Sequence, residues 1–535
     1  MMKYLQRNVV ALLIFLFNYL FSQQLRWAYI YPYFQQHAAS ECNDIIIGDD
    51  ENLYCVGRAS TGFAVITSLT REGSQRWIFH GFDTISTTSE NLNSIIFGSD
   101  NNIYAAGYRQ LTAVGNYYPV IISLTSIGSI RWIYTVPDPC STGLGFSSLI
   151  EGIDGNIYAC GEFNGNMGIV CISKQGTEIW KYEYNGTGNS DNEGAYSITQ
   201  DTLGNLYVVG ESYNSGTSWD FTVISLTNEG TLRWLYTYNG GAYPYYDCGY
   251  SIIYGGDGNI YTAGFTTTNS QNASDFIVIS LTPEGQERWI KSITGIPNVQ
   301  CDEYAYSIIY GEDGNIYTGG KIYHHAGLYN SASVVSFTSS GNERWIYRFN
   351  GPGNLGTTIF SMVYLYDNLY LACGDFYFSV LSLDNTGNEN WSYKLGGYRG
   401  AFKGRAECLT YDFDGNLYVG GSYKDSGFVI ISLTTSMVGN KECSKFLFKS
   451  KENFPVVPIF FKDKILLKFK YSLRKYINLS IYNVLGQKIF DKLYYTEDVF
   501  LKIDDIEIAK LSKGIYFLKI WSKKMDLGNY KIIKK

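Results

Sequence analysis

The sequence has little histidine and little proline. Only four histidines occur in 535 residues, at His37, His80, His324 and His325. Zinc centres and most acid–base catalysts depend on histidine, so the composition disfavours both. The adjacent pair falls in an expected loop, and neighbouring residues rarely chelate one ion because their side chains diverge. The sequence therefore predicts no metal ion and no bound cofactor.

Catalytic motifs are also missing. No Gly-x-Ser-x-Gly elbow stands out, and the adjacent carboxylates Asp302 and Glu303 are interpreted as solvated. The stretch Asp412-x-Asp414-Gly415-Asn416 resembles the start of a calcium loop, but it lacks the glycine at the sixth position and the glutamate at the twelfth. A hairpin turn explains it better, because Asp-Gly-Asn recurs elsewhere in the chain.

Positive charge is scarce over most of the chain. Residues 1–440 hold 21 Lys/Arg against 39 Asp/Glu, which gives a net charge of -18, whereas residues 441–535 hold 21 against 10, which gives +11. Nucleic-acid binding needs clustered Lys and Arg, so the acidic body excludes that partner. The abrupt change predicts a domain boundary near Asn440.

The N-terminus has the pattern of an export signal. Lys3 and Arg7 precede an apolar run from Val9 to Phe21, after which polar residues return. We therefore predict a signal peptide over residues 1–22, the alternative being an uncleaved anchor. No other stretch is long and apolar enough to span a bilayer, so no stable membrane span is expected after signal removal.

What the chain does have is a repeat. A tyrosine in the pattern Asn-(Ile/Leu)-Tyr recurs eight times, and so does a tryptophan that in seven cases stands in the pattern Gly-x-x-x-Trp, with successive copies 46 to 56 residues apart. The tyrosines are Tyr54, Tyr104, Tyr158, Tyr207, Tyr261, Tyr317, Tyr370 and Tyr418. The tryptophans are Trp27, Trp77, Trp132, Trp180, Trp234, Trp289, Trp345 and Trp391, the first of which lacks the glycine.

Each repeat predicts four short strands joined by glycine-containing turns. Repeated four-stranded units of this length are typical of β-propeller blades, whereas a solenoid would have shorter, more rigid repeats. The first tryptophan strand, at residues 25–29, has no partners before it, and the last unit, ending at Thr434, lacks its own. We therefore predict an all-β, eight-bladed β-propeller over residues 23–435, closed by the N-terminal strand, which removes exposed edges.

The tryptophans are expected to wedge against neighbouring blades. The arginines that precede six of them are expected in surface ion pairs: Arg26, Arg76, Arg131, Arg233, Arg288 and Arg344. The combined pattern resembles the propeller repeats of secreted bacterial proteins, and its Gly-x-x-x-Trp element is similar to the tryptophan-docking repeat of quinoprotein dehydrogenases. The vicinal cysteine pair that accompanies the quinone cofactor in that family is absent, so we reject a quinone.

The C-terminal residues change character. The stretch Tyr482-Asn483-x-x-Gly486-Gln487 and the stretch Gly514-Ile515-Tyr516 resemble the C-terminal sorting domain of the type IX secretion system. The resemblance implies a small β-sandwich over residues 454–535, preceded by a linker over residues 436–453. It also implies that the secretion machinery is a partner and that the protein is secreted or held at the outer-membrane surface. A generic adhesive sandwich is the alternative.

The ten cysteines have two expected settings. Cys55, Cys160, Cys171 and Cys373 fall on strands, where they fit as small buried hydrophobic residues. Cys42, Cys140, Cys248 and Cys301 fall between expected blades, where an exported protein could form disulfides, with a pairing that one sequence leaves open.

Loops after the second and fourth strand of each unit vary most, and they share one face of a propeller. They are rich in Tyr, Asn, Ser and Gly, a composition suited to adaptable recognition of a glycan or protein. The candidate ligand-binding residues are Tyr213, Trp219, Tyr243, Tyr245, Tyr246 and His324. Tolerated loop insertions are the alternative interpretation.

The sequence thus favours a non-enzymatic binding or structural propeller at the cell surface or outside the cell, with no catalytic residue that we can name. The alternative is an extracellular hydrolase or lyase, acting on polysaccharide or protein at the channel mouth. Carboxylates or histidines converging on the ring axis would favour the enzyme, and tyrosine, serine and aliphatic side chains would favour the binder.

Overall fold

The computed structural model forms two compact units, residues 1–438 and 439–535. In the first it describes residues 25–31, 40–59, 62–82, 89–111, 116–140, 143–188, 192–241, 246–267, 274–295, 302–323, 330–351, 356–375, 377–395, 404–412, 414–423 and 427–435. In the second it describes residues 460–461, 465–468, 475–482, 488–496, 500–503, 510–511, 514–522 and 525–534. The predicted signal peptide and linker, together with Tyr243, Tyr245, His324, Gly486 and Gln487, lie outside the described residues.

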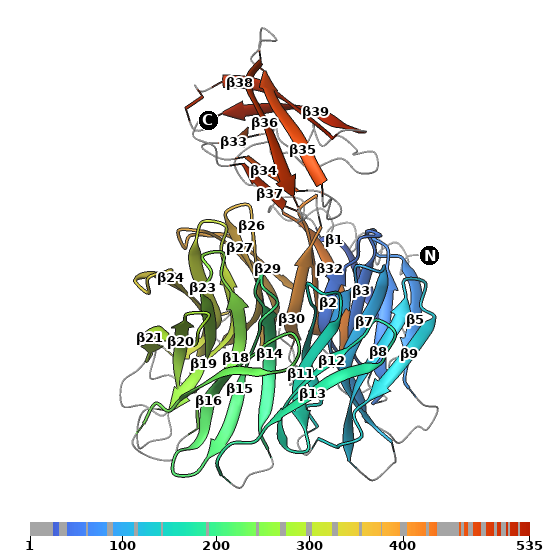
Figure 1. Ribbon diagram of the computed structural model, residues 1–535, viewed down its shortest axis with the longest axis vertical. Helices are drawn as coiled ribbons and strands as arrows, with labels where there is room; N and C mark the ends of the chain where they lie inside the picture. The colour runs from blue at the N-terminus through green and yellow to red at the C-terminus, as the bar shows by residue number, and fades with distance from the viewer. Residues whose placement is uncertain are drawn as a thin grey trace, which may run out of the picture. The chain divides into compact units, whose positions relative to one another are not determined.

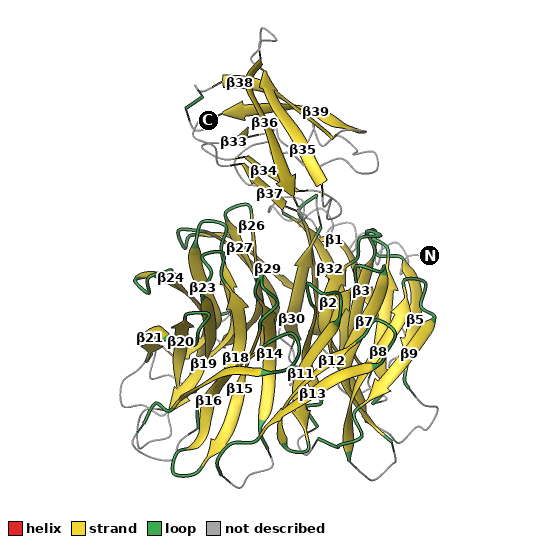
Figure 2. Ribbon diagram, in the orientation of Figure 1, coloured by secondary structure: helices red, strands yellow, loops and turns green. Residues whose placement is uncertain are grey.

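Every regular element among the described residues is a β-strand (Figure 2). Six antiparallel sheets hold four strands each, in chain order. The first three are β2 (Glu41–Ile47), β3 (Leu53–Arg58), β4 (Ala64–Leu69), β5 (Gln75–His80); β6 (Glu90–Phe97), β7 (Asn102–Gln110), β8 (Tyr117–Thr125), β9 (Ile130–Thr135); and β10 (Phe146–Glu151), β11 (Ile157–Phe163), β12 (Asn166–Ile172), β13 (Glu178–Tyr184). The next three are β14 (Gly194–Gln200), β15 (Leu206–Asn214), β16 (Ser218–Leu226), β17 (Leu232–Tyr238); β18 (Cys248–Tyr254), β19 (Ile260–Thr267), β20 (Ser274–Leu281), β21 (Glu287–Ile293); and β22 (Tyr304–Tyr310), β23 (Asn315–Tyr323), β24 (Asn330–Thr338), β25 (Glu343–Phe349).

A seventh sheet contains eight strands. One half is β26 (Thr357–Leu365), β27 (Asn368–Asp375), β28 (Phe378–Asp384) and β29 (Glu389–Leu395). The other half is β30 (Gly404–Tyr411), β31 (Asn416–Tyr423), β32 (Gly427–Thr434) and β1 (Leu25–Ile30). The halves meet through a single residue pair, Gly374 with Arg405. The N-terminal β1 pairs antiparallel with β32, with Ile30 opposite Val429.

The repeated unit folds as its turn chemistry predicts. Between β18 and β19, Asp257 accepts a hydrogen bond from the Asn259 backbone nitrogen (3.2 Å), and Gly258 adopts a positive φ of 83°. Between β20 and β21, Gly285 also has a φ of 83°. Glycine adopts this conformation at no steric cost, so the prediction of glycine-dependent hairpin turns is confirmed.

The first strand of each sheet contacts the first strand of the next. These contacts join β2, β6, β10, β14, β18, β22, β26 and β30 in succession, and β30 in turn contacts β2 (Figure 1). Four-stranded antiparallel sheets repeated around a shared centre are the architecture of a β-propeller. The core lies between successive sheets, as where Val209 and Phe221 of one sheet pack against Ile252 and Ile277 of the next.

Seven tryptophans join neighbouring sheets. Trp180 of β13 donates a hydrogen bond from Nε1 to the Asn228 carbonyl in the next sheet (2.9 Å), and its ring covers Gly230 in the same turn. The same pairing joins Trp27 to Gly73, Trp77 to Gly128, Trp132 to Gly176, Trp234 to Gly285, Trp289 to Gly341 and Trp345 to Gly387. Trp391 is also buried, at 8% exposure. Each glycine of Gly-x-x-x-Trp therefore receives the tryptophan of the preceding sheet.

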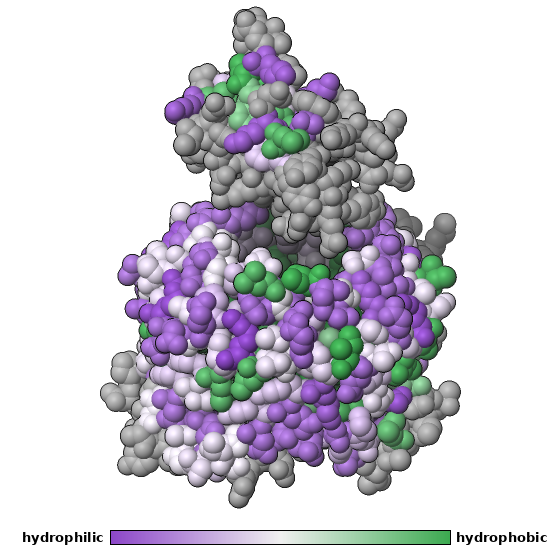
Figure 3. Space-filling view, in the orientation of Figure 1, coloured by the Kyte–Doolittle hydropathy of each residue, from purple (hydrophilic) through white to green (hydrophobic). Residues whose placement is uncertain are grey.

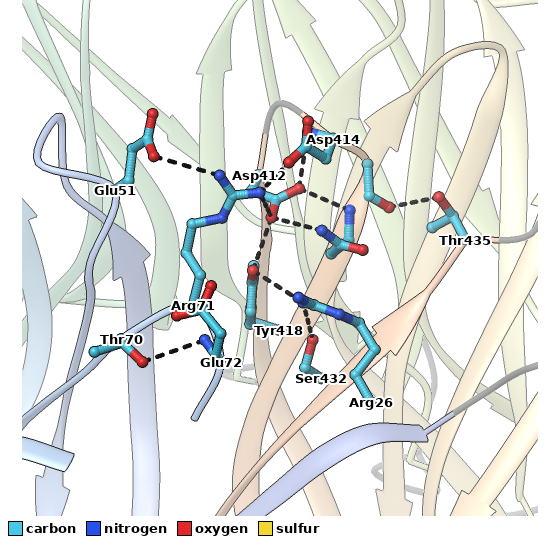
Figure 4. A network of polar contacts seen from close by, with 12 residues as sticks. Arg26, Glu51, Thr70, Arg71, Glu72, Asp412, Asp414, Tyr418, Ser432 and Thr435 are labelled. Carbon is cyan, nitrogen blue, oxygen red and sulfur yellow. Dashed lines mark hydrogen bonds and ion pairs between the residues drawn. The ribbon is translucent and has the colours of Figure 1, made fainter. Parts of the chain in front are cut away.

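The arginines before the tryptophans are more buried than predicted, and they make hydrogen bonds that the sequence did not predict. Arg233 donates from Nη1 to Ser225 (2.7 Å) and to the hydroxyl of Tyr207 (3.1 Å), which donates to Asp201 (2.8 Å). The predicted ion pairs form in three repeats, Arg76 with Asp50 (3.7 Å), Arg131 with Asp100 (3.4 Å) and Arg344 with Asp313 (3.8 Å). The predicted surface position is wrong, because the guanidinium lies half-buried over the repeated tyrosine, 5.7 Å from the ring centroid in Arg233. Arg26 of β1 makes the same two contacts, with Tyr418 (3.2 Å) and Ser432 (2.8 Å), as Figure 4 shows.

The C-terminal unit contains two sheets. Five strands form the order β33, β39, β38, β35, β36, and two form the other sheet, β34 with β37. The bounds are β33 (Phe460–Phe461), β34 (Ile465–Lys468), β35 (Lys475–Tyr482), β36 (Lys488–Thr496), β37 (Phe500–Ile503), β38 (Gly514–Ser522) and β39 (Met525–Lys534). Leu479, Ile481, Leu518 and Ile520 are fully buried. The predicted motif residue Tyr482 ends β35, Gly514 begins β38, and Tyr516 is buried at 6% exposure.

Candidate functional site

Three of the candidate ligand-binding residues lie together. Trp219 stacks edge-on against Tyr213 (ring centroids 4.8 Å apart) and against Tyr246 (5.6 Å). Tyr213 and Trp219 form a cross-strand pair rather than sitting in a loop, because β15 and β16 continue to a short turn around Gly216. Tyr246 comes from the connection between β17 and β18 and is 40% exposed. Ligand binding by these residues stays a prediction.

The aromatic cluster continues inward from Tyr246. Its ring contacts Phe265 at 5.1 Å, and Phe265 contacts Tyr304 at 4.6 Å. Tyr304 and Phe265 both contact Tyr250 of the first strand β18, at 6.3 and 5.7 Å. The loop aromatics are thus continuous with aromatics on the inner strands, where a propeller has its channel.

Four inner-strand rings form an arc across successive sheets. Tyr196 lies 5.5 Å from Tyr250, Tyr250 lies 5.2 Å from Tyr306, and Tyr306 lies 5.7 Å from Phe360. We call these four residues the inner arc. All four are half-buried. Grouped aromatic side chains with a few polar groups among them are common in small-ligand sites.

A β-bulge explains why these four side chains share one position. In every first strand the pairing with the second strand skips one residue. A bulged residue is left out of the ladder, and the bulge redirects its side chain. The skipped residues are Tyr196, Tyr250, Tyr306, Phe360, Glu407, Asn43, Asn93 and Ser147. Four consecutive first strands therefore contribute aromatics, and the other four first strands contribute polar side chains.

The polar side carries one carboxylate next to the arc. Arg405 lies over the ring of Phe360 at 4.3 Å and pairs with Glu407 at 3.4 Å. Burial raises the pKa of Glu407 to about 8; Arg405 opposes that shift, and Glu41 adds to it. At the bulged positions of β2 and β6, Asn43 donates a hydrogen bond to Asn91 (2.8 Å), and Asn93 donates to the carbonyls of Leu144 and Phe146.

A second carboxylate and an ammonium flank the aromatics. Glu211 is 4% exposed and accepts a hydrogen bond from the hydroxyl of Tyr196 (3.0 Å). Burial raises the pKa of Glu211, while the nearby Tyr246 hydroxyl and Cys248 thiol oppose the shift. Lys321 places its Nζ 4.4 Å from the ring centroid of Tyr304, and burial lowers its pKa.

Other buried carboxylates have a structural role. Glu303 is 1% exposed and accepts hydrogen bonds from the backbone nitrogens of Gly295 (2.8 and 2.9 Å) and Tyr323 (3.3 Å). Asp247 accepts from the equivalent nitrogens of Gly240 and Thr267. The prediction that Glu303 is solvated is wrong: burial raises its pKa to about 7. These carboxylates join the end of one sheet to the start of the next, so their pKa values do not indicate catalysis.

No metal-binding group of three or more His, Cys, Asp or Glu occurs among the described residues. Asp412, the first residue of the calcium-like stretch, instead accepts the backbone nitrogens of Asp414 and Asn416 and the hydroxyl of Tyr418. All eight cysteines within the described ranges are buried free thiols, and Cys42 and Cys248 lie on first strands rather than between sheets. Cys301 falls outside those ranges.

The propeller face in Figure 3 has fewer grouped apolar side chains than the aromatic cluster and the inner arc. On the face shown in Figure 3, polar residues dominate the propeller, and apolar residues form small separated groups. In the part of the chain that the structure describes, no helix is long and apolar enough to cross a bilayer. The aromatic cluster and inner arc are therefore a more concentrated candidate for ligand recognition than the face shown in Figure 3.

Sequence reasoning found the outer rings but missed the inner arc, Glu211, Glu407, Arg405 and Lys321. A signal for the arc was present. Tyr196, Tyr250, Tyr306 and Phe360 each precede a serine at the same position of four consecutive repeats. The bulge that redirects this position is not visible in a hydrophobic pattern, so the pattern alone does not mark it as a site.

Residues 458–535 match a family model described as "Secretion system C-terminal sorting domain". No curated protein matches the chain. Among solved structures, a protein of unknown function from Bacteroides caccae aligns at 16% identity over 57% of this chain and 97% of its own (TM-score 0.33). The C-terminal WD40 domain of Sif2 aligns at 10% identity over 75% and 98% (TM-score 0.45). The β-propeller domain of the Trilobed protease from Pyrococcus furiosus aligns at 10% over 65% and 94% (TM-score 0.39). Similarity at this level transfers neither a ligand nor an activity.

Proposed function

Residues 458–535 form a type IX secretion sorting domain, and we propose that the propeller it exports is a non-enzymatic recognition module with its ligand site on the inner arc and the adjoining cluster of Tyr213, Trp219 and Tyr246. The sorting domain directs the protein to the outer-membrane surface or the extracellular medium. Its two sheets are proposed to pack as a small sandwich. The observation that carries the proposed function is the unbroken series of ring contacts from Trp219 to Phe360.

The proposed ligand is a saccharide. Aromatic faces present flat apolar surfaces against which the C–H faces of sugar rings pack, and hydroxyl groups at their edges supply hydrogen bonds. Tyrosines supply both in the arc. The exported location supports this class, since surface and extracellular polysaccharides are what such a protein meets outside the cell.

We expect binding without turnover when the exported protein is presented with a glycan and polysaccharide array and substrate loss is followed in parallel. Replacing both Trp219 and Tyr246 by alanine should weaken binding about tenfold, which corresponds to about 1.4 kcal/mol. Tyr306→Ala tests the arc separately. Tyr366→Ala is the matched control, because this 48% exposed tyrosine lies in the β26–β27 turn, at the other end of the strands.

The two parts of the site give different results. Loss of binding in both sets of variants supports one continuous site. Loss only in the Trp219/Tyr246 variant would limit the site to the outer face, and equal affinity in all variants would overturn the assignment. Melting curves of each variant separate lost contacts from lost fold.

A second candidate function has its own observation. Glu407 adjoins the arc with a pKa of about 8, so it holds a proton near neutral pH, as the general acid of a polysaccharide hydrolase or lyase must. Turnover that disappears in Glu407→Gln while binding persists would favour this enzyme over the recognition module.

We also propose that the propeller has eight blades and that β1 completes the last. The single residue pair joining the two halves of the eight-stranded sheet supports counting them as two blades. The contact of β30 with β2 supports a closed ring. Arg71, in the turn between β4 and β5, also reaches Asp412 (2.8 Å) and Asp414 between β30 and β31 (Figure 4).

If β1 is a true blade strand, Arg26 should contribute as much to the unfolding free energy as Arg233 of an internal blade. Arg26→Met and Arg233→Met each remove hydrogen bonds to a tyrosine and a serine, and each should cost about 1–3 kcal/mol of unfolding free energy. Chemical denaturation of the two variants measures this. A silent Arg26→Met beside a destabilised Arg233→Met would argue against closure by β1.

A further inference from the structure

Three buried thiols meet where the first sheet contacts the last. Cys42 lies on β2, Cys55 on the adjacent β3, and Cys408 on β30. The Sγ atoms of Cys42 and Cys408 are 3.8 Å apart, although the residues are separated by 366 positions in the chain. Their exposures are 0% and 5%.

The local packing leaves room for the two sulfurs to approach. Both lie over Gly420 of β31, where a Cβ atom would come within 2.5 Å of the Cys42 sulfur and 2.7 Å of the Cys408 sulfur. The Cys408 thiol donates to the Cys42 carbonyl at 3.5 Å, so its side chain already points across the boundary between the sheets. A disulfide needs a sulfur–sulfur distance of about 2.05 Å, which small side-chain rotations can provide.

We propose that Cys42 and Cys408 form a disulfide bond in the exported protein and thereby link the first sheet of the propeller covalently to the last. The sorting domain sends the chain out of the reducing cytosol, and disulfides persist in such oxidising compartments. Closing a loop of this length restricts the unfolded chain strongly.

The bond forms by thiol–disulfide exchange. The thiolate of one cysteine attacks the disulfide of an oxidising protein of the thiol–disulfide oxidoreductase class, which forms a mixed disulfide. The thiolate of the second cysteine attacks the protein's own sulfur in that mixed disulfide and expels the oxidant as a dithiol. The oxidant takes up the two thiol protons and two electrons as it leaves in its reduced dithiol form. Because both sulfurs are buried in the folded ring, exchange takes place before the last sheet docks against the first.

Cys55 is the competing partner. It lies beside Cys42 within one sheet, where β2 and β3 are already paired through Ile45 and Cys55. A Cys42–Cys55 bond would connect neighbouring strands and leave the boundary between sheets without a covalent link. Of these two bonds, Cys42–Cys408 is the one that joins sheets distant in sequence, and its sulfur atoms are 3.8 Å apart.

The test is non-reducing peptide mapping of the full-length secreted protein after thiol alkylation during denaturation. We expect a linked peptide containing Cys42 and Cys408, and a melting temperature at least about 5 °C lower after reduction. Cys42→Ser and Cys408→Ser should each abolish that sensitivity to reductant, while Cys373→Ser, a buried thiol on β27, should retain it.

A Cys55→Ser variant removes the competitor and should still give the linked peptide. Alkylation of both Cys42 and Cys408 in the unreduced protein would overturn the proposal. So would a peptide that links either of them to any other cysteine.

Discussion

Replacing Gly230 by alanine should destabilise the propeller by about 3 kcal/mol or more. A Cβ atom at this position would lie 2.7 Å from the ring of Trp180, and Gly230 has a φ of 82°, which alanine adopts only under strain. The ring would have to leave the turn, which also breaks its hydrogen bond to Asn228. Overpacking of a well-packed contact costs about 1–3 kcal/mol on top of backbone strain of about 1–2 kcal/mol.

Gly216 provides the matched control. It has a similar φ of 92°, but no atom lies within 4 Å of the position of its Cβ. Gly216→Ala should therefore lose only the backbone term, about 1–2 kcal/mol. Urea denaturation of both variants measures the difference. Equal losses would mean that Trp180 contributes nothing through its contact with the glycine.

The same contact shows how far the sequence predicts the fold. The period of the tyrosines and tryptophans predicts four-stranded units, and the structure confirms this in each of the first six sheets. Such periodicity is readable because each unit must bury the same residues against its neighbours. The period does not say which residue of which sheet each tryptophan packs against. The glycine four residues before each tryptophan receives the ring of the preceding sheet, a relation that spacing within one repeat does not contain.

Other features of the fold depend on contacts between residues that are distant in the sequence. Arg233 was expected at the surface because alternation places it opposite the tryptophan, but alternation does not reveal that Tyr207 and Ser225 provide hydrogen bonds there. Glu303 was expected in solvent because charged residues seldom lie buried without partners. Its partners are backbone nitrogens of Gly295 and Tyr323, which have no mark in the sequence.

Recognising the inner arc requires both the sequence repeat and the strand pairing seen in the structure. Its members occupy one position of the repeat, so the sequence contains the aromatic series. The bulge that directs them to a common wall arises from pairing between first and second strands. The proposal that this wall binds a ligand therefore depends on the structure, whereas secretion follows from local motifs in the C-terminal unit.

Stability of the propeller should fall as the pH rises from about 5 to 9, and Glu407 should account for the upper part of that fall. Burial raises its pKa in the folded state from an ordinary 4.5 to about 8. The folded protein thus binds this proton more tightly than the unfolded chain does. The contribution is complete below about pH 4.5 and is lost as the pH rises through 8, by up to about 1.4 kcal/mol per pH unit.

Glu407→Gln keeps the shape of the side chain and removes its titration. The unfolding free energy of this variant should stay nearly constant between pH 7 and 9. Over the same range the unfolding free energy of the wild type should fall by about 1–2 kcal/mol. Glu303→Gln is the informative comparison. Burial raises the pKa of Glu303 to about 7, so this variant should differ from the wild type in slope mainly below pH 7 and follow it above.

Denaturation curves at half-unit pH intervals measure all three slopes. A Glu407→Gln curve parallel to the wild type above pH 7 would mean that the carboxylate is solvated beside Arg405 rather than buried against the arc. That outcome would also remove the protonated acid on which the hydrolase alternative depends. A flattened curve would leave Glu407 protonated at neutral pH and able to donate a hydrogen bond to the proposed saccharide ligand, with or without bond cleavage.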